Sequence, residues 1–286
     1  MNIIVGASGQ IGSHLTKRLL NKGIPAIAVV RNPEKVKDEK FKVRQADLFN
    51  LDQVINAFKG GTTAFLLTPE NPSSNDIIRD TKNITENYRK AVEENKIQRI
   101  VILSCIGAHI EGKTGNILMS QLLEKQFGDF NIEKIVIRPS YYFSNWLGFL
   151  STIEQYGVLP TFFPEDLKVE MHSPLDLADF IADVIAKPLG QQKTTIYELV
   201  GATKYSSLDI AKTFSTVFKK DVFTQSIASD KWKETLLSVG FTNNTADNLC
   251  DMTQAVVDGL TSPEYPNNTI TLKTDFENYI KQQLEK

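Results

Sequence analysis

The sequence has 286 residues, of which 41% are hydrophobic and 23% charged, so it is that of an ordinary globular protein able to bury one large core or two smaller ones. A formal net charge of −2 provides no dominant basic field, so we expect no nucleic-acid partner. Two cysteines are too few for a disulfide framework, and no apolar run is long enough to span a bilayer. We therefore expect a cytoplasmic protein with no membrane association and no metal site, and a strand that begins at residue 2 leaves no room for a signal peptide.

Three glycines lie between a predicted strand at residues 3–5 and a predicted helix with apolar residues at 11, 15 and 19. Gly6 would allow a tight turn, Gly9 would let a pyrophosphate approach the backbone, and Gly12 would let the helix pack closely on the sheet. The helix N-terminus offers unpaired N–H groups and partial positive charge to an anion. An ordinary glycine-rich turn is the alternative. The pattern predicts a dinucleotide-binding turn built from Gly6, Ser8, Gly9, Gln10, Ile11 and Gly12.

Arg31 follows the second predicted strand, residues 26–30. An acidic residue here would bind the ribose 2′-hydroxyl of NAD, whereas an arginine can pair with the 2′-phosphate of NADP. We therefore predict NADP(H) in preference to NAD(H), with Arg31 as the selecting residue and Lys35 as a helper. The alternative is a solvated charge at a strand end.

The next two strands, at about 42–46 and 63–67, place further residues at the same edge of a doubly wound sheet. Asp47 and Leu48 would lie near the adenine, although Asp47 could instead cap the turn into a helix at 51–58. Leu67, Thr68 and Pro69 would lie along the pyrophosphate and the nicotinamide ribose. A long helix is predicted at 75–94.

A continuous apolar run at 99–104 is typical of a parallel strand covered on both faces, and it ends at Ser104 in the predicted site. A helix at about 116–127 precedes a sixth strand, residues 132–139, which ends at Pro139. The aromatic stretch that follows suggests a flat apolar wall for a substrate, with packing as the alternative for any one ring. Its residues are Tyr141, Tyr142, Phe143, Asn145 and Trp146.

The second half of the chain alternates less regularly between strand and helix. Ser173 and the proline after it predict a helix start, and that helix runs to about residue 185. A strand is expected at 195–200, and further helices at 207–218, 229–239, 244–258 and 274–285. The predicted fold class is α/β, a doubly wound parallel Rossmann sheet at 1–150 with a smaller α+β C-terminal lobe at 151–286. The two are interleaved, since residues near 170–200 are candidates for a return to the Rossmann core.

Together these features resemble the atypical short-chain dehydrogenase/reductases of the NmrA-like group, which includes NADPH-dependent quinone reductases and dinucleotide-sensing regulators. The resemblance rests on residues 6–12, 30–33, 45–47, 102–104 and 137–139, and extends to about residue 185. It implies a Rossmann domain, NADP(H), and a cleft roofed by the C-terminal lobe.

One departure from that group's wider class concerns the catalytic pair. Typical short-chain dehydrogenases use Tyr-x-x-x-Lys, in which the lysine lowers the pKa of the tyrosine that donates a proton. None of the eight tyrosines here has a lysine four residues on, and Asn116 and Ser120 stand at the expected helix positions. Neither is a general acid near neutral pH. His109 is a candidate proton source, with a solvated loop histidine as the alternative.

Two functions fit these observations. The first is an NADPH-dependent oxidoreductase that transfers hydride to a quinone or a similar flat electrophile, since the reduced oxygens of a quinone can take protons from solvent. The second is a non-catalytic NADP(H)-sensing regulator of the NmrA type, which would report to a protein partner. The sequence leaves both open.

Overall fold

The central sheet is parallel throughout and has eight strands in the computed structural model, which describes residues 1–36 and 41–285. The strands are β1 (Asn2–Val5), β2 (Ala26–Val30), β3 (Lys42–Gln45), β4 (Thr63–Leu66), β5 (Arg99–Leu103), β6 (Glu133–Pro139), β10 (Thr194–Gly201) and β13 (Ile270–Leu272). Their order is β13-β10-β6-β5-β4-β1-β2-β3, so strand order reverses between β1 and β4. This confirms the predicted α/β doubly wound fold, in which ligands bind beside that reversal.

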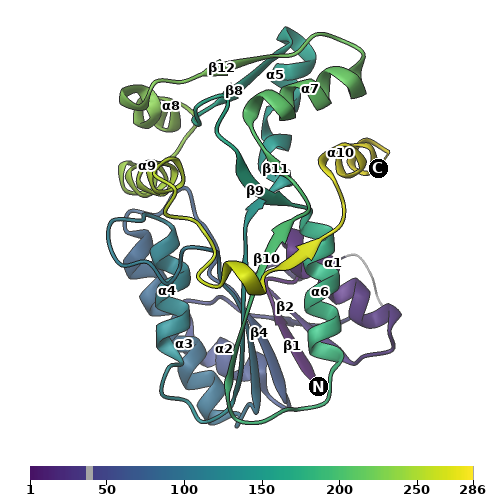
Figure 1. Cartoon of the computed structure of the whole chain (residues 1–286). Coiled ribbons are helices and arrows are strands. Elements are labelled where there is room, and N and C mark those ends of the chain that lie inside the picture. Colours follow the sequence, from purple (N-terminus) through teal and green to yellow (C-terminus); the bar gives the residue numbers. More distant parts are fainter. Residues whose placement is uncertain (37–40, 286) are drawn as a thin grey trace.

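Helices cover both faces of the sheet (Figure 1). On one face lie α1 (Gln10–Asn21) and α6 (Pro174–Ala186), and on the other lie α2 (Leu51–Phe58), α3 (Ile77–Glu94) and α4 (Ile117–Gln126). Side chains alternate along β1, so Ile3 and Val5 pack under the second group of helices and Ile4 under the first. All three are at most 1% exposed, which explains why the strand reads as a continuous apolar run.

The start of α1 is pressed against the turn that follows β1. Gly6 adopts φ = +68°, a conformation that favours glycine. At Gly12, an added Cβ would lie 2.2 Å from the Gly6 carbonyl oxygen and 2.7 Å from its carbon. The close approach predicted for Gly12 is therefore a feature of the fold, and only glycine fits there.

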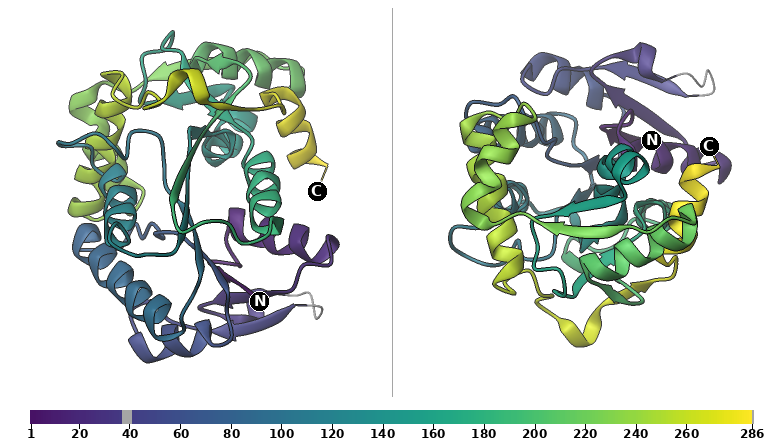
Figure 2. Two further views of the ribbon diagram at one scale, coloured as in Figure 1. Left: turned by 60° about the horizontal axis from the view of Figure 1, so that its bottom comes forward. Right: turned by 90° about the horizontal axis from the view of Figure 1, so that it is seen from above.

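The second half of the chain builds an upper lobe above the carboxyl ends of the strands (Figures 1 and 2). Two small sheets, β11-β9-β7 and β12-β8, lie in it. Its strands are β7 (Tyr141–Tyr142), β8 (Val158–Thr161), β9 (Val169–His172), β11 (Lys204–Tyr205) and β12 (Phe223–Ser226). Its helices are α5 (Leu150–Tyr156), α7 (Ser207–Phe218), α8 (Trp232–Ser238), α9 (Asn243–Val257) and α10 (Phe276–Leu284), with 3-10 helices at Phe143–Phe149 and Ser229–Lys231. Two further 3-10 helices lie at Pro33–Lys35, after β2, and at Pro266–Asn268, before β13.

The chain crosses between the sheet and the upper lobe several times. After β7 and β9 have formed part of the lobe, α6 packs on α1 and β10 pairs in parallel with β6. The lobe then continues through α7, α8 and α9, and β13 returns to pair with β10. The sheet is thus completed by strands from the second half of the chain.

His172 ends β9 with its side chain completely buried. Its Nδ1 lies 3.0 Å from the Ser140 hydroxyl, its ring packs edge-on against Tyr142, and its Nε2 has no hydrogen-bond partner among the described residues. Burial lowers the pKa of His172 to about 3, because a charged imidazole would lose its hydration there.

Replacing Gly12 with alanine should destabilise the protein by about 1 to 3 kcal/mol, because the new methyl group meets backbone atoms that cannot rotate away. Urea unfolding followed by circular dichroism measures the change. Gly148→Ala is the matched control, since a Cβ at Gly148 has no neighbour within 4 Å. Equal stability of the two variants would contradict the close packing at Gly12.

The buried His172 should make the folding free energy pH-dependent. The unfolded chain protonates this residue near pH 6.5 and the folded chain only near 3, so stability falls as the pH drops through that window. The slope contributed is at most about 1.4 kcal/mol per pH unit. Urea unfolding of His172→Gln over this range should show a shallower pH dependence than the wild type. Parallel curves would mean that folding does not lower the pKa of His172.

Candidate functional site

The N-terminus of α1 has no side-chain cap in the described part of the chain. Its N-cap residue is Gly9, and its first turn contains no acidic residue. The N–H of Gly9 donates to the Gly6 carbonyl at 2.9 Å, which closes the turn. Among the described residues, six other helices are capped by side chains, namely those of Asn50, Asp76, Ser173, Ser206, Thr242 and Asp275, whereas α4, α5 and α8 also lack a side-chain cap. The backbone N–H groups at the start of α1 are therefore available to an anion.

Around this turn, Ser8 and Gln10 are exposed, whereas Ile11 is only 6% exposed and packs in the core below. Gln10 accepts a hydrogen bond at 3.1 Å from the Ser144 hydroxyl in the upper lobe. The glycine turn and the lobe are thus in direct contact beside the end of β1. A side chain from Ile11 cannot reach a ligand, so this residue can contribute only its backbone.

The ends of β2 and β3 carry Arg31, Lys35 and Asp47 with their side chains exposed. The Arg31 carbonyl accepts a hydrogen bond from Gln45 at 3.2 Å, which joins the two strand ends. Asp47 accepts one from the N–H of Phe49 at 3.1 Å, so it stabilises the local turn, as the alternative interpretation expected, and still faces solvent.

Beyond β4, Leu67 and Thr68 are half-buried and Pro69 is exposed. Leu67 lies against the glycine turn, with its Cδ2 atom 3.1 Å from where a Cβ on Gly6 would be. The next residue, Glu70, accepts a hydrogen bond from Asn116 at 3.4 Å. Glu70 was not singled out from the sequence, although a carboxylate directly after the end of a parallel strand is a signal that could have found it.

The loop after β5 shows what replaces the missing tyrosine and lysine. Asn116 is the N-cap residue of α4 and contacts Glu70. Ser120, at the lysine position, is buried and close enough to the thiol of Cys105 to affect its pKa. Burial raises the pKa of Cys105 to about 11, so it stays a neutral thiol. The described residues thus place no general acid at either of the two helix positions.

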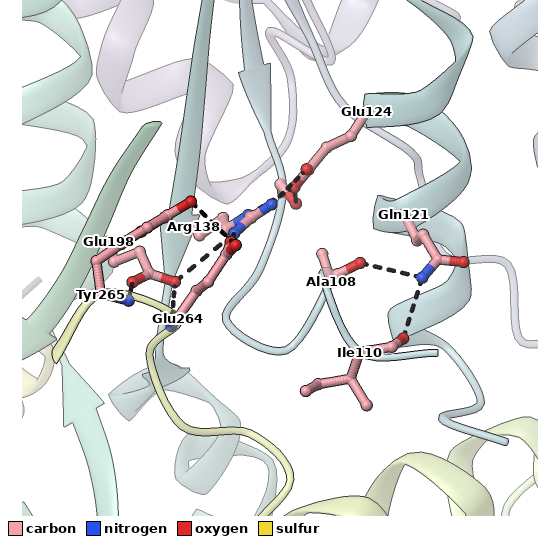
Figure 3. A network of polar contacts seen from close by, with 9 residues as sticks. Ala108, Ile110, Gln121, Glu124, Arg138, Glu198, Glu264 and Tyr265 are labelled. Atoms are coloured by element: carbon pink, nitrogen blue, oxygen red, sulfur yellow. Dashed lines mark hydrogen bonds and ion pairs between the residues drawn. The ribbon is translucent and has the colours of Figure 1, made fainter. Parts of the chain in front are cut away.

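Ser104 and the neighbouring end of β6 belong to a buried polar network centred on Arg138 (Figure 3). Arg138 makes paired hydrogen bonds to Glu124 at 2.9 and 2.7 Å, and Ser104 donates to the same carboxylate. On its other side Arg138 donates to Glu264. Burial acts to lower the pKa of Arg138, and these carboxylates outweigh it, so the pKa is raised and the charge is kept.

The same network ties distant segments together. Glu198 on β10 lies 3.8 Å from Arg138 and accepts the N–H groups of Glu264 and Tyr265 at 2.9 and 2.7 Å. On α4, Gln121 donates to the carbonyls of Ala108 and Ile110, which holds the loop before that helix (Figure 3). The half-buried His109 lies in this loop, close enough to Glu264 to affect its pKa, and its Nδ1 lacks a partner among the described residues.

The aromatic stretch divides into two sets. Phe143 and Trp146 are 1% and 2% exposed and pack in the core of the upper lobe, so the prediction that they face a substrate is corrected. The reason is that residues 143–149 form a 3-10 helix, in which side chains three apart share one side. Tyr141 and Tyr142 remain partly exposed and Asn145 exposed, while Pro139 is buried at the end of β6.

Two pockets on the structure lie away from these strand ends. One of about 410 Å³ is lined by Lys96, Gln98, Glu133 and neighbouring residues at the amino ends of β5 and β6. The other, of about 370 Å³, lies between α7 and β12. Ligands of a doubly wound sheet bind outside the carboxyl ends, so neither pocket corresponds to the predicted site. Within residues 1–36 and 41–285, no cluster of three or more His, Cys, Asp or Glu side chains could hold a metal. Nor does that part of the chain contain a helix both long and apolar enough to cross a membrane.

Comparisons with known proteins agree with this arrangement. Residues 6–134 match a family model described as NAD(P)H-binding. Among solved structures, the NADPH-dependent quinone oxidoreductase of Escherichia coli in complex with NADPH has a TM-score of 0.80 at 23% identity, over 99% of this chain and 100% of that one. Triphenylmethane reductase of Citrobacter sp. in complex with NADP(H) has a TM-score of 0.80 at 22% identity, over 99% of both chains.

A curated relative matches a shorter segment. Cinnamoyl-CoA reductase 2 of Medicago truncatula is 30% identical over 115 residues, which is 36% of this chain, and the match spans about a third of that relative. The resemblance predicted from the sequence is confirmed at the level of the fold: residues 6–134 match a model described as NAD(P)H-binding, and the whole chain shares the fold of the two solved structures above.

Proposed function

We propose that this protein is an oxidoreductase that uses NADPH to reduce a quinone or a similar flat electrophile. The observation that carries the proposal is the uncapped N-terminus of α1 behind a turn in which a Cβ on Gly12 would strike the Gly6 carbonyl. Such a start of α1 suits a pyrophosphate better than a protein side chain.

The residues around this turn fit the cofactor that the fold implies. A Cβ at Gly9 would come within 3.2 Å of the Gly6 oxygen, so glycine leaves the backbone at this position open to an approaching phosphate. When bound, the nicotinamide supplies a hydride. The residues proposed to hold the cofactor are Gly6, Ser8, Gly9, Gln10, Ile11 through its backbone, Gly12, Arg31, Lys35, Asp47, Leu48, Leu67, Thr68, Pro69, Ser104 and Pro139.

Preference for NADP(H) over NAD(H) follows from the charges at the end of β2. Arg31 and Lys35 are exposed, and neither enters an ion pair within residues 1–36 and 41–285. Both cations are therefore available to a 2′-phosphate, and Arg31 offers the planar, two-pronged donor that suits it.

A flat electrophile is proposed as the acceptor because the usual proton-donating pair is missing. Asn116 and Ser120 occupy its positions, and Ser120 is buried beside Cys105. Quinones do not require that pair, because their reduced oxygens can take a proton from another donor or from solvent, and the fold neighbours named above are a quinone oxidoreductase and a triphenylmethane reductase. Tyr141, Tyr142 and Asn145 are the residues that we propose to contact this small-molecule substrate.

Purified protein mixed with NADPH and a panel of quinones should consume NADPH with each accepted quinone, measured by the loss of nicotinamide absorbance. The control reaction omits the protein, since some quinones oxidise NADPH unaided. Tight NADPH binding without turnover of any acceptor would contradict the enzyme and favour a non-catalytic NADP(H)-sensing regulator with a protein partner.

Reversing the charge of Arg31 tests the cofactor preference. Arg31→Glu should weaken NADPH binding on the order of 10- to 100-fold, because a charge-assisted contact to the 2′-phosphate becomes a repulsion, and should leave NADH binding within about two-fold. Titration of nicotinamide fluorescence measures both constants. Lys17→Glu, an exposed position farther along α1, is the control for the change in net charge. Equal weakening of the two cofactors would show that Arg31 does not contact the 2′-phosphate.

A further inference from the structure

Glu70 stands apart from the other carboxylates near the strand ends because no cation pairs with it. None of the ion pairs within residues 1–36 and 41–285 includes it, whereas Glu124 and Glu264 both bind Arg138. It follows Thr68 and Pro69 at the carboxyl end of β4, next to the reversal of strand order. A carboxyl at this edge without a counter-ion is free to exchange a proton with a ligand.

The neighbour of Glu70 is an amide, which can serve either protonation state of a carboxyl. Asn116 donates from its Nδ2 to Glu70 at 3.4 Å, and the Oδ1 of the same amide is buried without a partner among the described residues. An amide in the opposite orientation would present that oxygen to a protonated Glu70, which would then donate to it. Either protonation state of Glu70 therefore has a hydrogen-bonding partner in Asn116.

The surroundings of Glu70 favour that proton. Its side chain is open to solvent, yet protein surrounds it closely enough that desolvation raises the pKa of its carboxyl, while the Asn116 contact acts in the opposite direction. The other titratable groups close enough to interact with Glu70 are Cys105, Tyr141 and Tyr142. Burial raises the pKa of Cys105 to about 11 and of Tyr141 to about 12, so both keep their protons at neutral pH.

We propose that Glu70 is the catalytic acid of this protein, which gives its proton to the oxygen of the acceptor as that acceptor is reduced. The proposal rests on the proposed NADPH-dependent reduction of a quinone. As the quinone takes up hydride and negative charge develops on its oxygen, the O–H bond of Glu70 breaks and a new O–H bond forms on that oxygen, which gives neutral hydroquinone and oxidised NADP+. The carboxylate left on Glu70 then takes a proton from water, which its open position allows.

The first test compares kcat for NADPH and 2-methyl-1,4-naphthoquinone over about pH 5 to 9 in the wild type and in Glu70→Gln. In the wild type kcat should fall as the pH rises through the pKa of Glu70, because the acid is lost. In Glu70→Gln kcat should be lower by about 10- to 100-fold at the acidic end, with that pH dependence gone and with NADPH affinity unchanged. Glu70→Asp should retain the pH dependence, and Glu94→Gln, an exposed carboxylate on α3, is the matched control.

Two results would overturn the proposal while leaving the proposed function intact. One is wild-type kcat and pH dependence in Glu70→Gln. The other is unchanged kcat with weakened NADPH binding, which would make Glu70 a cofactor contact. Failure of the wild type to reduce any quinone contradicts the proposed function instead.

A second measurement does not depend on turnover. Infrared difference spectra of the protein with NADP+ should show the carbonyl stretch of a protonated carboxyl that titrates above the ordinary glutamate range. The band should be absent in Glu70→Gln and present in Glu94→Gln. Ionisation of Glu70 within the ordinary range would overturn its role as the acid.

Discussion

The contact between the first turn of α1 and the Gly6 carbonyl fixes the position of almost everything else in the site. Because Gly12 has no Cβ, the first turn of α1 can pack directly against the Gly6 carbonyl. The helix therefore begins shortly after the end of β1, with the first N–H groups of the helix unpaired. The rest of α1 then holds the second half of the chain, since Arg18 pairs with Asp179 and Lys22 lies 2.9 Å from Asp183 on α6. One steric requirement thus sets both the candidate phosphate site and the docking of a helix that comes much later in the sequence.

On the other side of the site, the buried Arg138 positions the surrounding elements through its ion pairs. Arg138 on β6 joins Glu124 of α4 to Glu264 near β13, and Glu198 completes the set from β10. Taking such groups out of water is costly, and it is tolerated because nearly every polar atom finds a partner. The ion pair between Arg138 and Glu124 therefore holds α4, with Asn116 at its start, against the strand ends. The start of α1 is instead held by the close packing of Gly12 on the Gly6 carbonyl.

The sequence predicted the structure best at positions where the local geometry favours a single type of residue. The tight turn at Gly6 and the close packing at Gly12 were predicted correctly, because a positive φ favours glycine and a backbone contact at the Cβ position of Gly12 leaves no room for another residue. The run at 99–104 reads as a parallel strand because both faces of β5 are covered. Phe143 and Trp146 were misplaced because a 3-10 helix cannot be recognised from aromatic content alone. The strands β7, β8, β9, β11, β12 and β13 were all missed, because each has only two to four residues and is created by pairing with another segment. Glu70 was overlooked because a single carboxylate after a proline is usually a solvated loop charge.

The late return of β10 and β13 to the sheet has a consequence for how the chain is made. During synthesis, β6 leaves the ribosome long before β10, so its outer edge first exists with unpaired N–H and C=O groups. The other edge of β10 pairs with β13, which is synthesised only after α7, α8 and α9. The edge of the incomplete sheet thus stays unpaired and prone to aggregation for much of translation. A chain that ends within the upper lobe would keep this unpaired edge and would depend on chaperones instead of folding into a smaller functional protein.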